Sequence, residues 1–497
     1  MKLLVTTLVT LLAVGVVPAA GAEAQTVQPI QWHGCQVGVD DEVGRQLDEA
    51  GAECGELVVP LDYRDPDGRT ITVAMSRLKA TDTARRIGVM VLNDGGPGGP
   101  GLGMPLRLRV AMKEVGDRYD LIGVDPRFVG RSTPLDCDWP VGSGIWSAGA
   151  DRQSFDRAAG LAEDLADRCA ATHPDQLPYA TTRNTARDLD LIRDALGEEK
   201  ISYLGYSYGT YLGAVYLQMF PGRTDRVVLD GPGDPELFGP RLLRTTASAN
   251  EDALWAWAQW AAARDVTYHL GRTAGQVLAT VAKIYRVSHQ HPLKVGQYAV
   301  PEYAVPALVF ASLGSDKDAA RASFAELVVV LSKATKGPVA APPAIEGMLG
   351  AVLTGSMSAG ASSQMAIICG DRAAPRELAT YWKDIQRHRS AEPFTASTAR
   401  NLTPCAFWPN DPVEQPTRVD NDVPALIVAA TGDPRTTYPM AKALHQDLGG
   451  SRLITLQNVR SHGIYGEYGN QCVDNLVNNY LASNMLPTKD ATCRPAA

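Results

Sequence analysis

The segment ISYLGYSYGTYLGAVYLQM, residues 201–219, contains the motif Gly205-Tyr206-Ser207-Tyr208-Gly209. Residues 201–204 form a short apolar run typical of a buried strand, and residues 209–219 have the pattern of a helix. A serine at such a strand-to-helix junction is held on a tight turn at a helix N-terminus, where developing negative charge is favoured. The segment therefore predicts a nucleophile at Ser207.

Further strands and helices alternate along the chain on both sides of this motif. Residues 57–61 and 70–78 alternate in polarity, which predicts an antiparallel pair of strands at the start of the sheet. Buried strands are predicted by short apolar runs at 88–92, 121–124, 227–229, 425–429 and 453–456, and helices at 155–171, 185–196 and 440–448. The alternation predicts a doubly wound α/β sheet, and the serine turn makes it an α/β-hydrolase.

The strand pattern stops between the two halves of this sheet. The chain has 497 residues, more than one compact core usually needs. Residues 231–423 are mostly amphipathic and helical. We expect a hydrolase core at 25–230 and 424–497, with a helical cap domain at 231–423 inserted over the carboxyl ends of the strands.

The composition is that of a globular protein. Hydrophobic residues make up 45% and charged residues 21%, which leaves no room for a long disordered tail. The net charge of -8, without a block of like charge, argues against nucleic acid or an anionic membrane as a partner.

The N-terminus predicts export. Residues 3–17 are almost continuously apolar, and the small residues that follow offer cleavage sites after Ala22 or Ala24. This pattern predicts a signal peptide at 1–24 and a secreted, extracellular protein. The run is shorter than the roughly 20 residues that a spanning helix needs, so no stable membrane insertion is expected.

The cysteine count agrees with export. Eight cysteines, an even number, fit an oxidised exported protein, and none has the CxxC spacing of a zinc or redox motif. Their connectivity does not follow from sequence alone. Pairing neighbours closes the shortest loops and would join Cys35 to Cys54, Cys137 to Cys169, Cys369 to Cys405 and Cys472 to Cys493.

A glycine-rich loop, NDGGPGGPG at 93–101, follows the strand predicted at 88–92. Hydrolases with a serine turn place the second donor of the oxyanion hole at this point. We expect the hole to consist of the N–H of Tyr208 and one N–H from Gly95 or Gly96, between which the sequence does not choose. The spacing matches neither GxGxxG nor the P-loop pattern, and the prolines remove donors, which argues against a phosphate loop.

The base and the acid come from the C-terminal part of the chain, because a serine hydroxyl needs a neighbouring base and this fold orders the residues as serine, acid, histidine. His445 lies inside a predicted helix, whereas His462 lies in the loop after the last predicted strand and is the expected base. Asp433 follows a predicted strand and would orient the imidazole. Asp230 also ends a strand and is the alternative acid, but Asp433 precedes His462 closely.

Several segments together resemble the secreted tripeptidyl-aminopeptidase family of actinobacteria, which belongs to the prolyl-aminopeptidase-like serine peptidases. The resemblance extends over about residues 54–493. It rests on NDGGPGGPG (93–101), YDLIGVDPRFVGRSTPLDC (119–137), GYSYGTYLGAVY (205–216), VVLDGPGDP (227–235), the pair Cys369 and Asp371, and GDPRTTYPMA (432–441).

This resemblance implies release of short peptides from free amino termini through an acyl-enzyme on Ser207. The cap would hold the terminal ammonium, for which Asp371 and Glu236 are the candidate carboxylates. Two departures from the family, Phe128 in place of a usual glycine and Pro100 in place of a small residue, are expected at the mouth of the pocket. No metal and no organic cofactor is implied, because a triad and an oxyanion hole supply the chemistry themselves.

The sequence leaves two enzyme interpretations open. The first is an exported exopeptidase that releases di- or tripeptides from substrates with a free N-terminus. The second is an esterase, amidase or acyl-transfer enzyme that acts on a small natural product, because the nucleophile does not select the substrate. A complete set of serine, acid and histidine disfavours a non-catalytic binding protein. The sequence contains no signal for an oligomeric state.

Overall fold

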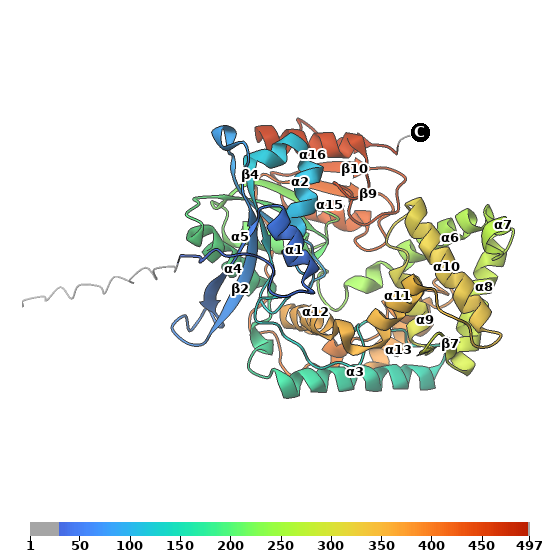
Figure 1. Cartoon of the computed structure of the whole chain (residues 1–497). Helices are drawn as coiled ribbons and strands as arrows, with labels where there is room; N and C mark the ends of the chain where they lie inside the picture. Colours follow the sequence, from blue (N-terminus) through green and yellow to red (C-terminus); the bar gives the residue numbers. More distant parts are fainter. Residues whose placement is uncertain (1–28, 496–497) are drawn as a thin grey trace, which may run out of the picture.

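The computed structural model describes residues 29–495, and the signal peptide expected at 1–24 lies outside them (Figure 1). Nine strands form one sheet in the order β1-β2-β4-β3-β5-β6-β9-β10-β11. Their bounds are β1 (Glu53–Pro60), β2 (Thr70–Leu78), β3 (Gly88–Asn93), β4 (Tyr119–Val124), β5 (Ile201–Tyr206), β6 (Thr224–Asp230), β9 (Leu426–Ala430), β10 (Arg452–Leu456) and β11 (Ala491–Cys493).

Strand directions bring the loops of interest to one edge of the sheet. β1 pairs antiparallel with β2, and β2 pairs antiparallel with β4. All other neighbours in the sheet are parallel. The predicted antiparallel pair and parallel core are therefore confirmed. Because the carboxyl ends of parallel strands meet, the loops after β3, β5, β6, β9 and β10 lie at the same edge.

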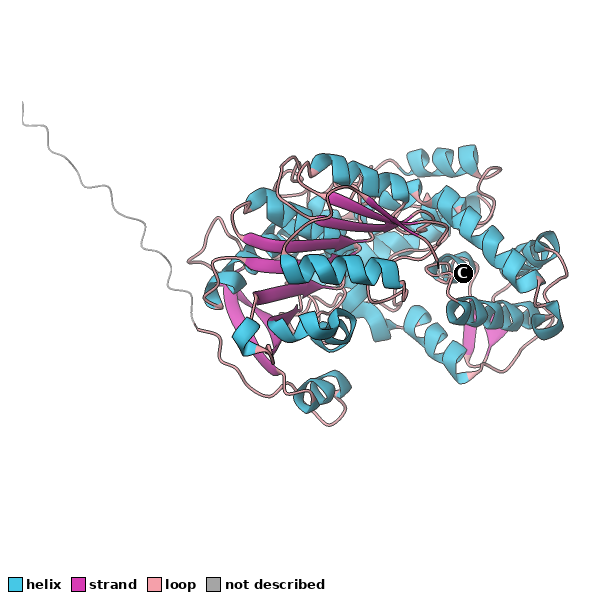
Figure 2. Cartoon of the chain, turned by 90° about the horizontal axis from the view of Figure 1, so that it is seen from above, coloured by secondary structure: helices cyan, strands magenta, loops and turns pink. Residues whose placement is uncertain are grey.

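Helices cover both faces of this sheet (Figure 2). Alternate residues of a strand point to opposite faces. In β3, Met90 and Leu92 join the core beneath α1 (Glu42–Glu49), α2 (Met104–Met112) and α16 (Gln471–Ser483). Val89 and Val91 join the core of the other face, with α4 (Thr182–Ala195), α5 (Tyr208–Met219) and α15 (Tyr438–Asp447). The sheet is doubly wound, as predicted.

A mainly helical region separates β6 from β9. It lies beside the sheet in Figure 1 and contains one small antiparallel pair, β7 (Leu293–Val295) and β8 (Tyr298–Val300), which the sequence did not predict. No helix within residues 29–495 has the length and apolar character to cross a membrane. The helices of this region are α6 (Ala247–Ala262), α7 (Asp265–Tyr268), α8 (Ala274–Gln290), α9 (Ala304–Ala311), α10 (Asp318–Ala334), α11 (Pro343–Leu353), α12 (Ser358–Asp371), α13 (Leu378–His388) and α14 (Ala396–Ala399).

The helix predicted at 155–171 forms, as α3 (Arg152–Thr172), but it extends beneath the inserted helices (Figure 1). Phe155 and Ala159 of α3 are buried against Tyr381 and Ile385 of α13. The chain between β4 and β5, which lies within the expected core segment 25–230, therefore packs against the inserted helices.

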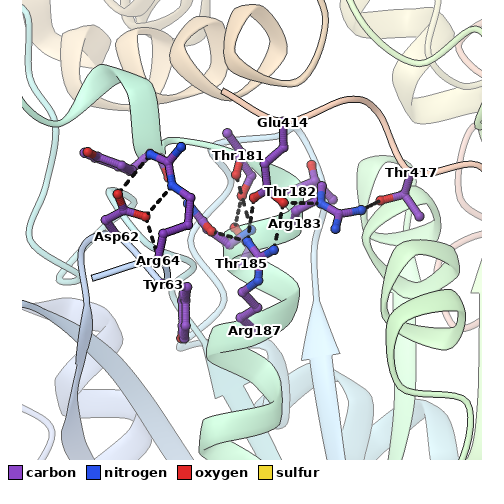
Figure 3. A network of polar contacts seen from close by, with 12 residues as sticks. Asp62, Tyr63, Arg64, Thr181, Thr182, Arg183, Thr185, Arg187, Glu414 and Thr417 are labelled. Atoms are coloured by element: carbon purple, nitrogen blue, oxygen red, sulfur yellow. Dashed lines mark hydrogen bonds and ion pairs between the residues drawn. The ribbon is translucent and has the colours of Figure 1, made fainter. Parts of the chain in front are cut away.

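A cluster of charges joins the end of the inserted region to the core (Figure 3). Arg183 and Arg187 of α4 both donate to the Glu414 carboxylate, at N–O distances of 2.6–2.8 Å. Arg183 also donates to the Thr417 hydroxyl at 2.8 Å. Hydrogen bonds and charge from Arg187, followed by those from Arg183, lower the pKa of Glu414 to about 2, although burial opposes the change. This cluster fixes the returning chain just before β9.

Four disulfides join cysteines that are neighbours in the sequence. They link Cys35 to Cys54, Cys137 to Cys169, Cys369 to Cys405 and Cys472 to Cys493. Cys137–Cys169 ties the chain after β4 to α3, and Cys369–Cys405 closes a loop inside the inserted region. Within the described residues no cysteine is free.

Candidate active site

The turn between β5 and α5 holds Ser207 in a strained conformation, with φ 54° and ψ -119°. Such a positive φ costs energy for any residue with a side chain. The Ser207 N–H donates to the Asp230 carbonyl at 2.9 Å, which ties the turn to the end of β6. On its other side, the Thr210 hydroxyl donates to the Ser207 carbonyl at 2.6 Å. These bonds hold Ser207 at the N-terminus of α5.

The two glycines of the motif are required because there is no room for a side chain. A Cβ at Gly205 would lie 2.5 Å from the Gly209 carbonyl oxygen. A Cβ at Gly209 would lie 2.7 Å from Oδ1 of Asn93. The first contact would push α5 away from β5, and the second would push α5 away from the glycine-rich loop, so the motif preserves the close packing of these three segments.

Asp433 and His462 come together from the loops after β9 and β10. His462 Nδ1 lies 2.8 Å from Asp433 Oδ2. The carboxylate is buried and also accepts the N–H groups of Arg435 and Thr436, at 2.7 and 3.1 Å, and the Thr436 hydroxyl at 3.0 Å. A proton on Nδ1 directed at this carboxylate leaves Nε2 as the acceptor of the ring.

Asp230, the alternative acid, holds the histidine loop by its backbone. Its Oδ2 accepts the N–H groups of Ile464 and Tyr465 at 2.9 and 2.6 Å. Its Oδ1 is buried without a hydrogen-bond partner among the described residues. Burial raises the pKa of Asp230 to about 7, although the two N–H groups oppose the change. Of the two aspartates, Asp433 contacts the imidazole.

The glycine-rich loop lies directly against the serine turn. A Cβ at Gly95 would be 2.4 Å from the Tyr206 carbonyl oxygen and 3.0 Å from Ser207 Cβ. The Gly95 N–H donates to Asn93 Oδ1 at 3.1 Å, whereas no hydrogen bond found within residues 29–495 uses the Gly96 N–H. Tyr208 is the first residue of α5, so its N–H has no partner within the helix.

Ser207 and His462 line one cavity of about 480 Å³ between the sheet edge and the inserted helices. The apolar part of its wall includes residues from α9, α11 and the chain before α3. In the part of the chain that is described, no three His, Cys, Asp or Glu side chains gather as metal ligands would. The lining residues are Asp94, Gly96, Ser143, Ile145, Trp146, Ser207, Phe238, Leu242, Leu243, Ala307, Leu308, Phe310, Ala311, Val352, Gln364, Arg435, Thr436 and His462.

The two carboxylates expected to hold a substrate ammonium lie elsewhere. Asp371 is buried at the N-terminus of α4, where it accepts the N–H and the hydroxyl of Thr182 at 2.7 and 2.5 Å. Burial raises its pKa to about 7. Glu236 is exposed, and neither residue lines the cavity. Asp371 instead fixes Thr182, whose hydroxyl lies 2.8 Å from that of Tyr208.

The two departures from the family pattern also lie away from the pocket mouth. Phe128 is fully buried in the core with φ 69°, and its carbonyl accepts the Ser363 hydroxyl at 2.6 Å. Pro100 is exposed on the glycine-rich loop. Since neither lines the cavity, the expectation that they reshape its mouth was wrong.

The structure adds two charged residues to the cavity that the sequence analysis did not single out. Asp94 precedes Gly95 and is paired with Arg107. Arg435 lies two residues after Asp433, in the loop that follows β9. The sequence did offer a signal for both, because each is a charged residue in a loop that the sequence had already assigned to the site.

Comparison with known proteins agrees with this geometry. A family model described as alpha/beta hydrolase fold matches residues 88–320, and one described as TAP-like protein matches residues 391–493. Tripeptidyl aminopeptidase of Streptomyces lividans is 34% identical, over 90% of this chain and 84% of that protein. Two proteins of Mycobacterium tuberculosis are each 29% identical: serine protease Hip1, over 98% of this chain and 96% of its own length, and carboxylesterase B, over 96% and 93%.

The sequence identity, the matched segments and the fold all point to the same family. The first of these relatives exceeds 30% identity and is aligned over most of both chains. The TAP-like match covers β9, β10 and the loops that hold Asp433 and His462. The chain belongs to the tripeptidyl-aminopeptidase-like family of α/β-hydrolases.

Proposed function

We propose that this protein is a secreted serine exopeptidase that removes short peptides from free amino termini. Ser207 is the nucleophile, His462 the general base and Asp433 the acid that orients it. The observation that carries this assignment is the 2.8 Å contact between His462 Nδ1 and Asp433 Oδ2, beside a cavity that Ser207 also lines.

The reaction follows from the chemistry of these groups. The Ser207 hydroxyl attacks the peptide carbonyl while His462 Nε2 takes its proton, and Asp433 stabilises the imidazolium that forms. His462 then protonates the leaving amine, which leaves an acyl-enzyme on Ser207. A water molecule, activated by His462, hydrolyses this ester and releases the short peptide.

The oxyanion of the tetrahedral intermediate is assigned to the N–H groups of Tyr208 and Gly96. The Tyr208 N–H has no partner in its helix and lies at the positive end of the helix dipole. Gly96 is preferred to Gly95 because Gly96 lines the cavity, whereas the Gly95 N–H already donates to Asn93. Two such donors are the usual arrangement for acyl transfer.

The cavity favours cleavage near a chain end. Its volume of about 480 Å³ lies in the range of small-ligand pockets, so it admits a short piece of a peptide. Asp94 is the carboxylate among its lining residues and takes the role of the ammonium contact in place of Asp371 and Glu236. Its ion pair with Arg107 holds it in position. Export is supported by the four disulfides and the signal peptide expected from the sequence.

The test is turnover of di- and tripeptide fluorogenic substrates, each with a free and an acetylated amino terminus. We expect the mature enzyme to cut only the free-amine members. Ser207→Ala should abolish turnover and labelling by a fluorophosphonate, while Ser323→Ala, an exposed serine of α10, should behave like the wild type. Labelling that survives Ser207→Ala would overturn the nucleophile, and equal cleavage of acetylated peptides would overturn the aminopeptidase.

An esterase is the second candidate, favoured by the largely apolar wall of the cavity and by the similarity to carboxylesterase B. The same panel separates the two functions. Cleavage of simple esters without cleavage of any peptide would establish the esterase.

A further inference from the structure

Arg435 is a cation on the wall of the catalytic cavity. It lies in the loop after β9, two residues beyond Asp433. None of the carboxylates within residues 29–495 forms an ion pair with its guanidinium, and the Asp433 carboxylate accepts the backbone N–H of Arg435 instead. A charge inside a protein is costly unless it is paired, so this one needs an explanation.

Neutral groups fix the orientation of the guanidinium. Its Nη2 donates to the carbonyls of Phe310 and Ala311, at 2.5 and 3.0 Å, and its Nη1 donates to Asn250 Oδ1 at 3.1 Å. The group also lies over the Phe310 ring, 4.4 Å from its centre. Burial lowers the pKa of Arg435 to about 10, with Asp433 opposing the change, so the side chain stays charged at neutral pH.

One role of Arg435 is evident from these bonds. Phe310 and Ala311 are the last residues of α9, whose terminal carbonyls have no partner within the helix. A cation at this position also suits the helix dipole. Capping α9 explains the two hydrogen bonds of Nη2, but it does not explain why another part of the side chain lines the cavity.

Two N–H donors of the guanidinium remain available for a ligand. Arginine has five N–H donors, and the three bonds above leave Nε–H and one N–H of Nη1. The side chain is partly exposed. The nearby Gly314 has no side chain to cover it, since a Cβ there would come within 3.9–4.0 Å of Nη2 and Nε.

The position of Arg435 indicates which part of a substrate it faces. The Gly314 carbonyl accepts the His462 N–H at 2.9 Å, so Arg435 lies beside the histidine loop. His462 gives its proton to the leaving group, which must therefore lie on the histidine side of the serine. Asp94, in contrast, adjoins the oxyanion loop.

We propose that Arg435 binds a carboxylate on the leaving fragment of the substrate, and so selects substrates that have one. The carboxylate is the acidic side chain of the residue after the cleaved bond, or the C-terminal carboxylate when the leaving fragment is a single residue. The planar guanidinium suits carboxylates, and charge-assisted bonds are the strongest hydrogen bonds in proteins. This inference rests on the proposed function for the identity of the leaving group.

The experiment uses short peptides with a free amino terminus in matched pairs. One pair has Glu or Gln after the cleaved bond, with an amidated C-terminus. The other ends in a single leaving alanine with a free or an amidated carboxylate. Products are identified by mass spectrometry, and kcat/KM is measured for the wild type, Arg435→Gln, Arg435→Lys and Arg372→Gln. Arg372 is the matched control, because it also donates to two backbone carbonyls but does not line the cavity.

We expect the wild type to prefer the anionic member of at least one pair by about tenfold, the worth of one charge-assisted hydrogen bond. Arg435→Gln should remove the preference by slowing the anionic member about tenfold more than the neutral one, and Arg435→Lys should retain part of the preference. Arg372→Gln should keep the full preference. No preference in the wild type, an equal loss for both members in Arg435→Gln, or a preference confined to acidic residues before the cleaved bond would overturn the proposal.

Failure of the proposed function would have a different signature. If the wild type cleaves esters but no peptides, the same comparison is made with acetate esters of 4-hydroxybenzoate and 4-hydroxybenzamide, whose leaving groups differ in one carboxylate. The four enzymes and the expected ranking stay the same. If thermal unfolding shows that Arg435→Gln is not folded, the wild-type preference and its reduction in Arg435→Lys decide the question.

Discussion

Two buried aspartates lie at the carboxyl ends of neighbouring strands, at the catalytic edge of the sheet, and they have different roles. Asp230 ends β6 and Asp433 follows β9, and the two strands pair in parallel. Both carboxyl groups are almost fully buried. Both carboxylate oxygens of Asp433 accept hydrogen bonds: Oδ1 from the Arg435 N–H and Oδ2 from His462 Nδ1. Asp230 bonds on one oxygen only, and to backbone rather than to the ring.

The difference shows that burial at a strand end does not identify a catalytic acid. An acid that stabilises an imidazolium must stay ionised and lie within reach of Nδ1. The Asp433 carboxylate has four hydrogen-bond contacts, one of them with the imidazole of His462. Asp230, with an unpartnered oxygen, has its pKa raised to about 7 by burial and serves to position the loop that follows His462.

The largest effect is expected for Asp433→Asn. The amide would direct an N–H at Nδ1 and favour the wrong tautomer of His462, so kcat for peptide cleavage should fall by about 10³- to 10⁴-fold. The rate of fluorophosphonate labelling of Ser207 should fall with it. Thermal unfolding checks that the fold is intact. A variant that keeps a tenth of the wild-type kcat would remove Asp433 from the catalytic set.

A smaller effect is expected for Asp230→Asn. The amide oxygen can still accept the N–H groups of Ile464 and Tyr465, so kcat/KM should fall by about tenfold or less. Asp230→Ala should lower kcat/KM further, because each buried N–H left without a partner costs about 1–3 kcal/mol. Kinetics of both variants beside Asp433→Asn give the ranking. The reverse order would make Asp230 the acid.

Elements whose residues are adjacent in the sequence were predictable. The serine turn, the parallel strands and the four helices between them follow from local patterns of polarity. His462 was chosen over His445 because a loop at the sheet edge exposes its side chain, and His445 does lie within α15. Chain order, rather than chemistry, separated Asp433 from Asp230, since both end a strand.

Features that depend on distant packing were not predictable. One example is the packing of Phe155 in α3 on α13, more than two hundred residues away along the chain. Asp371 was expected at the pocket from its motif, but its carboxylate turns to Thr182. Asp94 and Arg435 lie in loops that the sequence assigns to the site, but whether they line the cavity depends on the inserted helices that form its other walls, which no local pattern encodes.

The smallest effect on catalysis belongs to a third prediction, which concerns the pH dependence of stability. Burial raises the pKa of Asp230 from 3.8 to about 7, so the folded protein holds this proton more tightly than the unfolded chain. The stabilisation is complete below about pH 4 and is lost as the pH rises to 7. Between pH 5 and 8 the free energy of unfolding of the wild type should therefore fall relative to Asp230→Asn, by about 2.5 kcal/mol.

Urea unfolding at several pH values measures this difference, and Glu414→Gln is its control. The pKa of Glu414 is lowered to about 2 by Arg187 and Arg183, so its stabilisation is present above about pH 4.5 and lost only as the pH falls toward 2 (Figure 3). Glu414→Gln should thus lower stability equally from pH 5 to 8. Parallel curves for the wild type and Asp230→Asn would mean that Asp230 is already ionised at pH 5. The contrast between the two aspartates would then rest on their hydrogen bonds alone.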